Sequence, residues 1–328
     1  MTTLRIAIIG GALVSSSLFP LSNFFCSLAG PGGLMLARLL QHSNIPCSVF
    51  ELDTDRHARA QGGTLDIHQD SGQQALREAG LIDEFQKHMR VDGTALRIVN
   101  KKGDLLFEVI EDEERKKARP EIDRALLRRI LLDSVQPDSI FWGKKLVNVE
   151  PTSNNKFNLR FADGKIQTDF DLVVGADGAW SRVRLLLTST VPIYSGVNGV
   201  ETSITDVDTR FPHLSSLVGN GSYFAFGDGD GKAIMAQRIG NGSVRVYAVH
   251  RSPAEWREKR GLDFTKREEA LESMMRSEYG AWSDGVKELV RAGGELIERT
   301  LYMLPVGIKW ESRPGCIFRI TLNSNSIY

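Results

Sequence analysis

Three glycines and one acidic residue near the start of the chain have the types and order that a phosphate-binding turn requires. Gly10 follows residues 4–9, which are apolar apart from Arg5, as is typical of a parallel strand covered on both faces. Gly30 and Gly33 precede a stretch with helical periodicity, and Glu51 stands at the end of a second apolar run. This order predicts a strand, a turn, a helix and a second strand, with dinucleotide binding at the turn.

The spacing fits that fingerprint when residues 11–28 are left out. Gly10 then joins Ala29, and the stretch through Gly33 becomes GxGxxG, with Glu51 about twenty residues further on. In such a site the first glycine makes the tight turn, the second lets the backbone approach a pyrophosphate, and the third lets the helix pack on the strand. The helix N-terminus faces the phosphates, and the acid binds a ribose. A chance cluster of glycines beside a long loop is the alternative.

Residues 11–28 carry no charge and stand where the turn must be tight. We interpret them as a spurious insert, such as translated non-coding sequence from a short retained intron. Removal of residues 12–29 restores the same spacing. The alternatives are a genuine family-specific loop, a signal peptide or a membrane span, because residues 6–37 are uncharged. Serines, Pro20 and glycines interrupt the apolar run, which disfavours the last two.

The composition excludes several classes of protein. The 328 residues hold 41 Lys plus Arg and 41 Asp plus Glu, so the zero net charge gives no reason to expect nucleic acid or an anionic membrane as a partner. Three widely spaced cysteines, Cys26, Cys47 and Cys316, favour neither a disulfide framework nor a zinc site. We expect a cytoplasmic monomer without a metal.

Several later segments have the pattern of strands and turns around a cofactor. Residues 62–68, GGTLDIH, follow the second strand, and residues 171–178, DLVVGADG, are a buried strand that ends in a turn. Residues 190–305 contain alternating strands. Residues 124–135 have helical periodicity with one apolar face. That helix carries three basic residues expected to face solvent: Arg124, Arg128 and Arg129.

Together these stretches resemble the single-component (class A) flavin monooxygenases of the para-hydroxybenzoate hydroxylase fold. That class carries GxGxxG, then a DG motif and then a GD motif. Within the class, the sequence is most similar to the tetracycline-inactivating FAD monooxygenases over residues 62–81, 120–135 and 252–256. The likeness covers most of the chain apart from residues 11–28 and 319–328.

The resemblance implies an α/β fold, with a Rossmann-like FAD-binding domain and an inserted β-sheet substrate domain. We assign residues 1–189 to the first domain, 190–305 to the sheet domain and 306–328 to a truncated return to the first domain. In the family the strand at 313–318 leads into the GD motif, whose Asp binds FAD, and no Gly-Asp follows here. We interpret residues 319–328 as a frameshifted or intron-derived tail.

The activity that the resemblance implies is oxygenation dependent on FAD and NAD(P)H. NADPH would reduce FAD, the reduced flavin would form a C4a-hydroperoxide with O2, and one oxygen atom would pass to an aromatic, polyketide-like or enol small molecule. The protein would supply orientation and exclude water. The alternatives are another FAD oxidoreductase of the same fold, such as an epoxidase or halogenase, and a catalytically impaired flavin fold.

The resemblance also implies roles for individual residues. Glu51 would bind the adenosine ribose of FAD, Asp66 would lie near the flavin, and Arg124 would contact FAD. Arg59 occupies the position credited with NADPH binding, and Asp177 belongs to the DG motif, which touches both FAD and the nicotinamide cofactor in this class. The structural alternatives are that the two aspartates only cap turns and that the two arginines are only surface charges.

The expected substrate side of the sheet differs from that of the tetracycline-acting group. Where that group uses Arg and His, this chain places Tyr223 and Arg245. Packing within the sheet is the simpler account of its aromatic residues. The exchange argues against tetracycline itself as the substrate.

Overall fold

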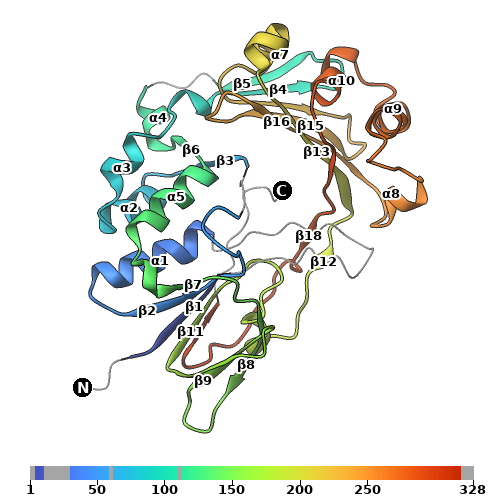
Figure 1. The fold of residues 1–328 in the computed structure, drawn as a ribbon. Helices are drawn as coiled ribbons and strands as arrows, with labels where there is room; N and C mark the ends of the chain where they lie inside the picture. The colour runs from blue at the N-terminus through green and yellow to red at the C-terminus, as the bar shows by residue number, and fades with distance from the viewer. Residues whose placement is uncertain (1–3, 11–29, 59–61, 110–112, 319–328) are drawn as a thin grey trace.

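A five-stranded parallel sheet forms the centre of the first part of the fold. The computed structural model describes residues 4–10, 30–58, 62–109 and 113–318 (Figure 1). In sheet order, the strands are β19 (Cys316–Phe318), β11 (Leu172–Ala176), β1 (Ile6–Gly10), β2 (Cys47–Phe50) and β7 (Ile140–Phe141). Every neighbouring pair is parallel, and β1 is buried along its whole length. The prediction of a central parallel strand at the start of the chain is confirmed.

Helix α1 (Pro31–His42) packs on the parallel sheet, as the sequence predicts. Gly33 makes the close approach possible, because a Cβ there would lie 3.1 Å from the Cβ of Ala176 and 3.6 Å from Cγ2 of Ile8. Leu34 is fully buried one residue further along the helix. Gly33 therefore lies where helix and strand approach most closely, which is the position that the spacing predicts for a third glycine.

Substitution of Gly33 by Val is expected to destabilise the protein by about 1–3 kcal/mol, because the branched side chain overfills the space against Ala176 and Ile8. Urea unfolding followed by circular dichroism measures the change. Gly285→Val is the matched control, since Gly285 is also helical and no heavy atom lies within 4 Å of its ideal Cβ position. Equal effects of the two substitutions would contradict the packing role of Gly33.

Helices cover one face of the parallel sheet, and a small antiparallel sheet covers the other (Figure 1). The helices are α1 and α5 (Arg124–Ser134), with α2 (Gly72–Glu78) and α3 (Ile82–Gln86) packed on them. The small sheet has the order β10 (Ile166–Phe170), β9 (Phe157–Phe161), β8 (Leu146–Pro151). Ile8 belongs to the core on the helical side, whereas Ile9 packs with Phe157 on the other side. Successive residues of β1 thus face opposite layers.

A seven-stranded mixed sheet forms the second part of the fold. Its order is β17 (Ile297–Glu298), β13 (Val197–Ile204), β16 (Val244–Arg251), β15 (Lys232–Arg238), β14 (Ser222–Phe226), β4 (Leu96–Asn100) and β5 (Leu105–Val109). Five helices belong to this part: α6 (Val207–Arg210), α7 (Pro212–Val218), α8 (Trp256–Lys259), α9 (Arg267–Ser277) and α10 (Asp284–Arg291). Figure 1 shows α7, α9 and α10 on the outer face of the sheet. The inner face looks toward the parallel-sheet part, and the strands come from both sides of residue 189.

The remaining elements are short. Strands β3 (Thr64–Asp66) and β6 (Glu121–Asp123) pair with each other, as do β12 (Ile193–Tyr194) and β18 (Tyr302–Met303). Helix α4 spans Glu113–Ala118, and 3-10 turns span Asp92–Thr94, Pro137–Ser139 and Arg184–Leu186.

Two observations bear on the expectations for these segments. The turn expected at the end of residues 171–178 is confirmed: it is capped by Asp177 and leads into the last of the 3-10 turns. No helix in the described ranges is long and apolar enough to cross a bilayer. Residues 11–28, interpreted as an insert, and residues 319–328, interpreted as a tail, lie outside the described residues.

Candidate functional site

Three of the predicted site residues lie at the carboxyl edge of the parallel sheet. Gly10 is the last residue of β1 and pairs with Ala176 of β11. Asp177 follows that residue directly, and Glu51 follows the last residue of β2 on the other side of β1. In open parallel sheets, ligands bind outside the carboxyl ends of the strands, between neighbouring strands. The chain therefore brings these three positions together where that geometry predicts a ligand.

The N-terminus of α1 has the features of an anion site. Gly30 is the N-cap residue and has no side chain with which to cap the helix, and Pro31 is the first helical residue. The first amide groups of a helix carry partial positive charge and lack partners within the helix. A diphosphate is the ligand that such a terminus accepts, and Gly33 lets the helix lie close to the strand. These residues fit a bound dinucleotide.

Glu51 is fully buried, and its segment is held by backbone hydrogen bonds. Its amide donates to the carbonyl oxygen of Phe141 at 2.9 Å, and its carbonyl accepts from the amide of Lys144 at 2.6 Å. One carboxylate oxygen, Oε1, accepts from the amide of Asp53 at 3.0 Å. The buried acid at the end of the second strand thus has a fixed position, as a ribose-binding carboxylate needs.

A buried ion pair joins the Glu51 segment to helix α5. Nη2 of Arg128 lies 3.2 Å from Oδ2 of Asp53, and both side chains are almost completely shielded from solvent. The expectation that Arg128 faces solvent is therefore wrong. Helical periodicity identified its neighbours as apolar, but the sequence did not show that an acid from the segment after β2 would meet it. Arg129, the next residue, is exposed as expected.

Asp177 is buried at the turn that follows β11. Burial raises the pKa of its carboxyl, while hydrogen bonds from the Ser181 hydroxyl and the Arg182 amide lower it. The amide of Arg182 lies 2.8 Å from Oδ2. Asp177 therefore caps the turn, which is the structural alternative for this residue, and it does so at the carboxyl edge of the sheet. Arg59, expected to bind NADPH, lies outside the described residues.

Asp66 and Arg124 lie on neighbouring elements at the border of the two sheets. Asp66 is exposed and pairs in register with Glu121 of β6. Arg124 begins α5, and its amide donates to the carbonyl oxygen of Gly63 at 3.1 Å. Burial lowers the pKa of its guanidinium, and the charge of Arg245 lowers it further. Arg124 thus faces the seven-stranded sheet rather than bulk solvent.

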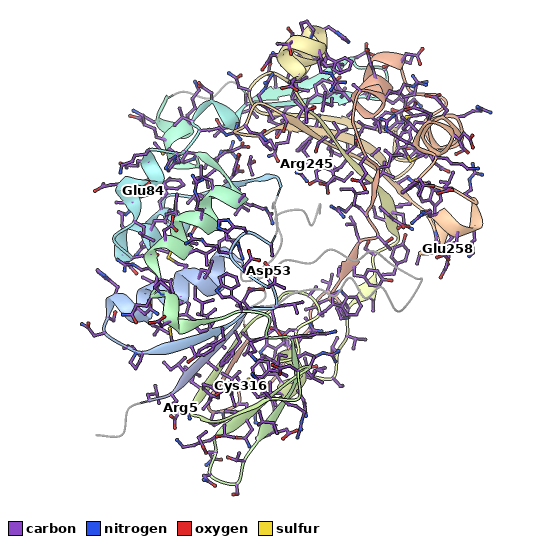
Figure 2. All side chains as sticks on the ribbon, in the orientation of Figure 1. Arg5, Asp53, Glu84, Arg245, Glu258 and Cys316 are labelled. Atoms are coloured by element: carbon purple, nitrogen blue, oxygen red, sulfur yellow. The ribbon has the colours of Figure 1, made fainter. Side chains whose placement is uncertain are left out.

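The inner face of the seven-stranded sheet carries a charged cluster, the Glu201 cluster, made of Glu201, Arg245 and Arg299. Oε1 of Glu201 accepts a hydrogen bond from Nη1 of Arg245, and Oε2 lies 2.6 Å from Nε and from Nη2 of Arg299. Figure 2 labels Arg245 on the side of the sheet that faces the parallel-sheet part. Its guanidinium packs directly against Gly62, since a Cβ on that glycine would lie 1.7 Å from Nη2.

Tyr223 does not lie on this inner face. Its side chain is buried in the core under the outer helices, together with Ala225 and Ile234. Phe224, the next residue of β14, belongs to the inner group instead. The expectation that Tyr223 stands on the substrate side of the sheet is therefore wrong, because side chains alternate along β14 and Tyr223 takes the face that is covered by the outer helices.

Comparison with known proteins identifies the family. The model of a family described as "FAD binding domain" matches residues 29–280. The chain belongs to the FAD binding domain family. Monooxygenase asqM of Emericella nidulans is 29% identical over 327 residues, which cover 85% of this chain and 72% of that protein. Monooxygenase penA of Penicillium thymicola is 29% identical over 322 residues, with 85% and 73% covered. These similarities place this FAD-binding protein among the flavin-dependent oxidoreductases.

Solved structures share the fold of this family member. The 2,6-dihydroxypyridine-3-hydroxylase of Arthrobacter nicotinovorans aligns with a TM-score of 0.72 at 16% identity, over 97% of this chain and 76% of that one. Tetracycline destructase Tet(51) aligns with a TM-score of 0.60 at 16% identity, over 97% and 74%. The fold of a class A flavin monooxygenase, predicted from the motifs, is confirmed.

Several charged residues of this FAD-binding protein were not singled out in its sequence. Arg128 and Asp53 are far apart along the chain, and Glu201 lies in a strand beside apolar residues, so no local pattern marks them. A charged residue in the middle of a strand segment is the signal that could have pointed to Glu201. Within the described residues, no group of three or more His, Cys, Asp and Glu side chains could hold a metal ion.

Glu121 is a buried acid at the border of the two sheets. Burial raises the pKa of its carboxyl to about 7, although the charge of Arg90 lowers it, and Asp66 adds to the rise. Nη2 of Arg90 lies 2.8 Å from Oε2, and Nε2 of Gln237 lies 3.3 Å from Oε1. Glu121 therefore connects β6 to the seven-stranded sheet and changes charge near neutral pH.

The free energy of unfolding is expected to fall by up to about 3 kcal/mol as the pH rises through 7, because the folded state binds the Glu121 proton more tightly than the unfolded state does. The contribution of the Glu121 proton to the free energy of unfolding is fully present below about pH 4.5 and is lost as the pH rises through about 7. Urea titrations at pH 5, 6, 7 and 8 measure it. Glu121→Gln should remove the slope, whereas the control Glu84→Gln, at an exposed acid, should keep it. A wild-type slope in Glu121→Gln contradicts the prediction.

Proposed function

We propose that this protein is a monooxygenase dependent on FAD and NAD(P)H, which inserts one oxygen atom of O2 into an aromatic, polyketide-like or enol small molecule. The observation that carries the proposal is the carboxyl edge of the parallel sheet, where Gly10, the N-terminus of α1 and buried Glu51 fit a dinucleotide. The monooxygenase names of asqM and penA support the reaction type. The substrate leaves hydroxylated, and the second oxygen atom leaves as water with the electrons of NAD(P)H.

The predicted site residues have proposed roles in holding FAD or NADPH. The first-turn amides of α1 donate to the pyrophosphate. Glu51 accepts hydrogen bonds from the adenosine ribose, and Arg124 and Asp66 lie toward the flavin. Asp177 holds the turn beside both cofactors, and Arg59 contacts NADPH. When bound, FAD supplies hydride acceptance and oxygen activation, chemistry that no amino-acid side chain supplies.

The inner face of the seven-stranded sheet is the proposed substrate side. The Glu201 cluster holds Arg245 in one orientation against Gly62. Phe224, Met235 and Tyr247 form an apolar surface beside it. A flat, apolar and partly charged wall can orient an oxygen-bearing ring and exclude water from the reacting centre.

The experiment uses the full chain purified with FAD. Flavin absorbance, NAD(P)H oxidation, O2 consumption and the mass of products from phenolic, polyketide-like and enol compounds are measured. The expected result is one O2 and one NAD(P)H consumed per product, whose mass increases by one oxygen atom. Tight flavin binding without reduction by NADH or NADPH would count against the proposal.

A second candidate is oxygen transfer to a carbon–carbon double bond. Zeaxanthin epoxidase of Oryza sativa subsp. japonica is 27% identical over 214 residues, which cover 63% of this chain and 28% of that protein. An epoxide rather than a phenol among the products of an alkene substrate would favour it.

We further propose that the protein is a cytoplasmic monomer with domain boundaries at residues 189 and 305. Light scattering tests the oligomeric state, and limited proteolysis tests the domain boundaries.

A further inference from the structure

Arg128 of α5 makes three contacts with the segments that follow β2 and β7. Its Nη2 lies 3.2 Å from Oδ2 of Asp53, and its Nη1 donates to the carbonyl oxygen of Arg56 at 3.0 Å. Its guanidinium carbon lies 5.8 Å from the ring centroid of Trp142. A planar guanidinium donates from two separate nitrogens in a fixed geometry while it lies near an aromatic ring, a combination that the compact ammonium of a lysine does not match.

These contacts reach Glu51 through Asp53. The amide of Asp53 donates to Oε1 of Glu51 at 3.0 Å, and its carbonyl oxygen accepts from the amide of Gly143 at 2.7 Å. Asp53 is therefore held from three sides, by its side chain, its amide and its carbonyl. A shift of Asp53 would move the group that fixes one oxygen of the Glu51 carboxylate.

Stability of the fold does not by itself account for the buried pair of Arg128 and Asp53. The side chains of Arg128 and Asp53 are 5% and 2% exposed, and their desolvation opposes the attraction between them. Apolar side chains of similar size often stabilise such a position as well or better. What an apolar pair would not supply is a directional contact on the segment that carries Glu51.

Position along α5 links the pair to the rest of the proposed site. Arg128 lies one helical turn after Arg124, so both lie on the same side of the helix. Arg124 faces the seven-stranded sheet, and Arg128 reaches the segment after β2. Figure 2 labels Asp53 on the side of the parallel-sheet part that faces the seven-stranded sheet.

We propose that Arg128 is a positioning residue for the ribose-binding acid: through Asp53, it holds the Glu51 carboxylate in the orientation that accepts the adenosine ribose. The inference rests on the proposed function, because it requires the bound dinucleotide to be FAD, one half of which is an adenosine nucleotide. Arg128 itself contacts neither the ribose nor the flavin. Its loss therefore weakens binding of the adenosine half and leaves binding of the flavin half unchanged.

The test separates the two halves with ADP and FMN as probes. The variants are Arg128→Lys, and the double change Arg128→Met with Asp53→Asn, which leaves no unpaired charge buried. Titration calorimetry on the full chain should show ADP affinity reduced by about tenfold to a hundredfold, with FMN affinity within twofold of wild type. The control is Arg129→Met, an exposed arginine on the same helix, which should change neither affinity.

Amide hydrogen exchange gives a readout that needs no ligand. The amides of Asp53 and Gly143 should exchange faster in both Arg128 variants, while amides of β9 should not change. If the double variant does not fold, Arg128→Lys decides the question. Unchanged ADP affinity, unchanged exchange, or an equal loss of ADP and FMN binding overturns the proposal.

The outcome for the wild-type chain distinguishes the two proposals. A chain that binds ADP and FMN but does not oxidise NAD(P)H refutes the proposed function, and the ADP titrations still decide the role of Arg128. A wild-type chain that binds no ADP overturns the role of Arg128 as well.

Discussion

Removal of residues 11–28 is expected to raise the affinity for FAD by at least about a hundredfold. The deletion joins Gly10, at the end of β1, to Ala29, one residue before the N-cap of α1. A turn of that length lets backbone amides meet the pyrophosphate. Each hydrogen bond to a charged group contributes about 1.5–3 kcal/mol, and about 1.4 kcal/mol corresponds to tenfold in affinity. Two additional hydrogen bonds therefore account for the expected change.

The elements on either side of residues 11–28 are already those of a dinucleotide site. β1 is the central strand, α1 packs on it through Gly33, and buried Glu51 follows β2. The family model also matches from residue 29 onward and not from the first strand. Both observations support the interpretation that the interruption, rather than the surrounding sequence, limits FAD binding.

Flavin fluorescence quenching on the full chain and on the deleted form measures the change. Removal of residues 12–29 is the matched control, because it restores the same glycine spacing and should give the same gain. The deletion combined with Gly33→Val should lose much of it, since that substitution separates helix from strand. An undeleted chain that binds FAD as tightly as the deleted form would show that residues 11–28 are functional sequence.

The parallel-sheet part of the fold was predictable because its signals are local. An apolar run, a glycine spacing and a following acid specify β1, α1 and the end of β2 within about fifty residues. Alternation indicated strands within residues 190–305 in the same way, and β15 and β16 are two of them. The site positions at the carboxyl edge follow from this, since parallel neighbours end on the same side.

The charged contacts were not predictable because they join residues that are distant in sequence. Arg128 of α5 pairs with Asp53 in the segment after β2. The Glu201 cluster joins side chains of β13, of β16 and of the segment after β17. Tyr223 was placed on the wrong face for a different reason: successive side chains of a strand point to opposite faces, so the face depends on the exact register of β14 in the sheet. Pairing partners and exact strand register are properties of the assembled sheets.

Replacement of Glu201 by Gln is expected to destabilise the protein by up to about 3–5 kcal/mol, because the side chains of Arg245 and Arg299, each 18% exposed, lose their shared carboxylate. Burial lowers the pKa values of Arg245 and Arg299, which is the sign of charges kept from water. Urea unfolding measures the loss. The control is Glu268→Gln, since Glu268 pairs with Arg267 but is 79% exposed, and its loss should stay within about 1 kcal/mol.

A third variant separates charge from shape at the Glu201 cluster. When Arg245→Gln and Arg299→Gln accompany Glu201→Gln, the three charges of the cluster are removed together, so much of the lost stability should return. The inner face of the sheet would then be neutral, and under the proposed function kcat/KM should stay low while the fold recovers. Stability that does not recover in the triple variant would show that the cluster acts through packing, and a single Glu201→Gln loss below about 1 kcal/mol would show that water already solvates both guanidiniums.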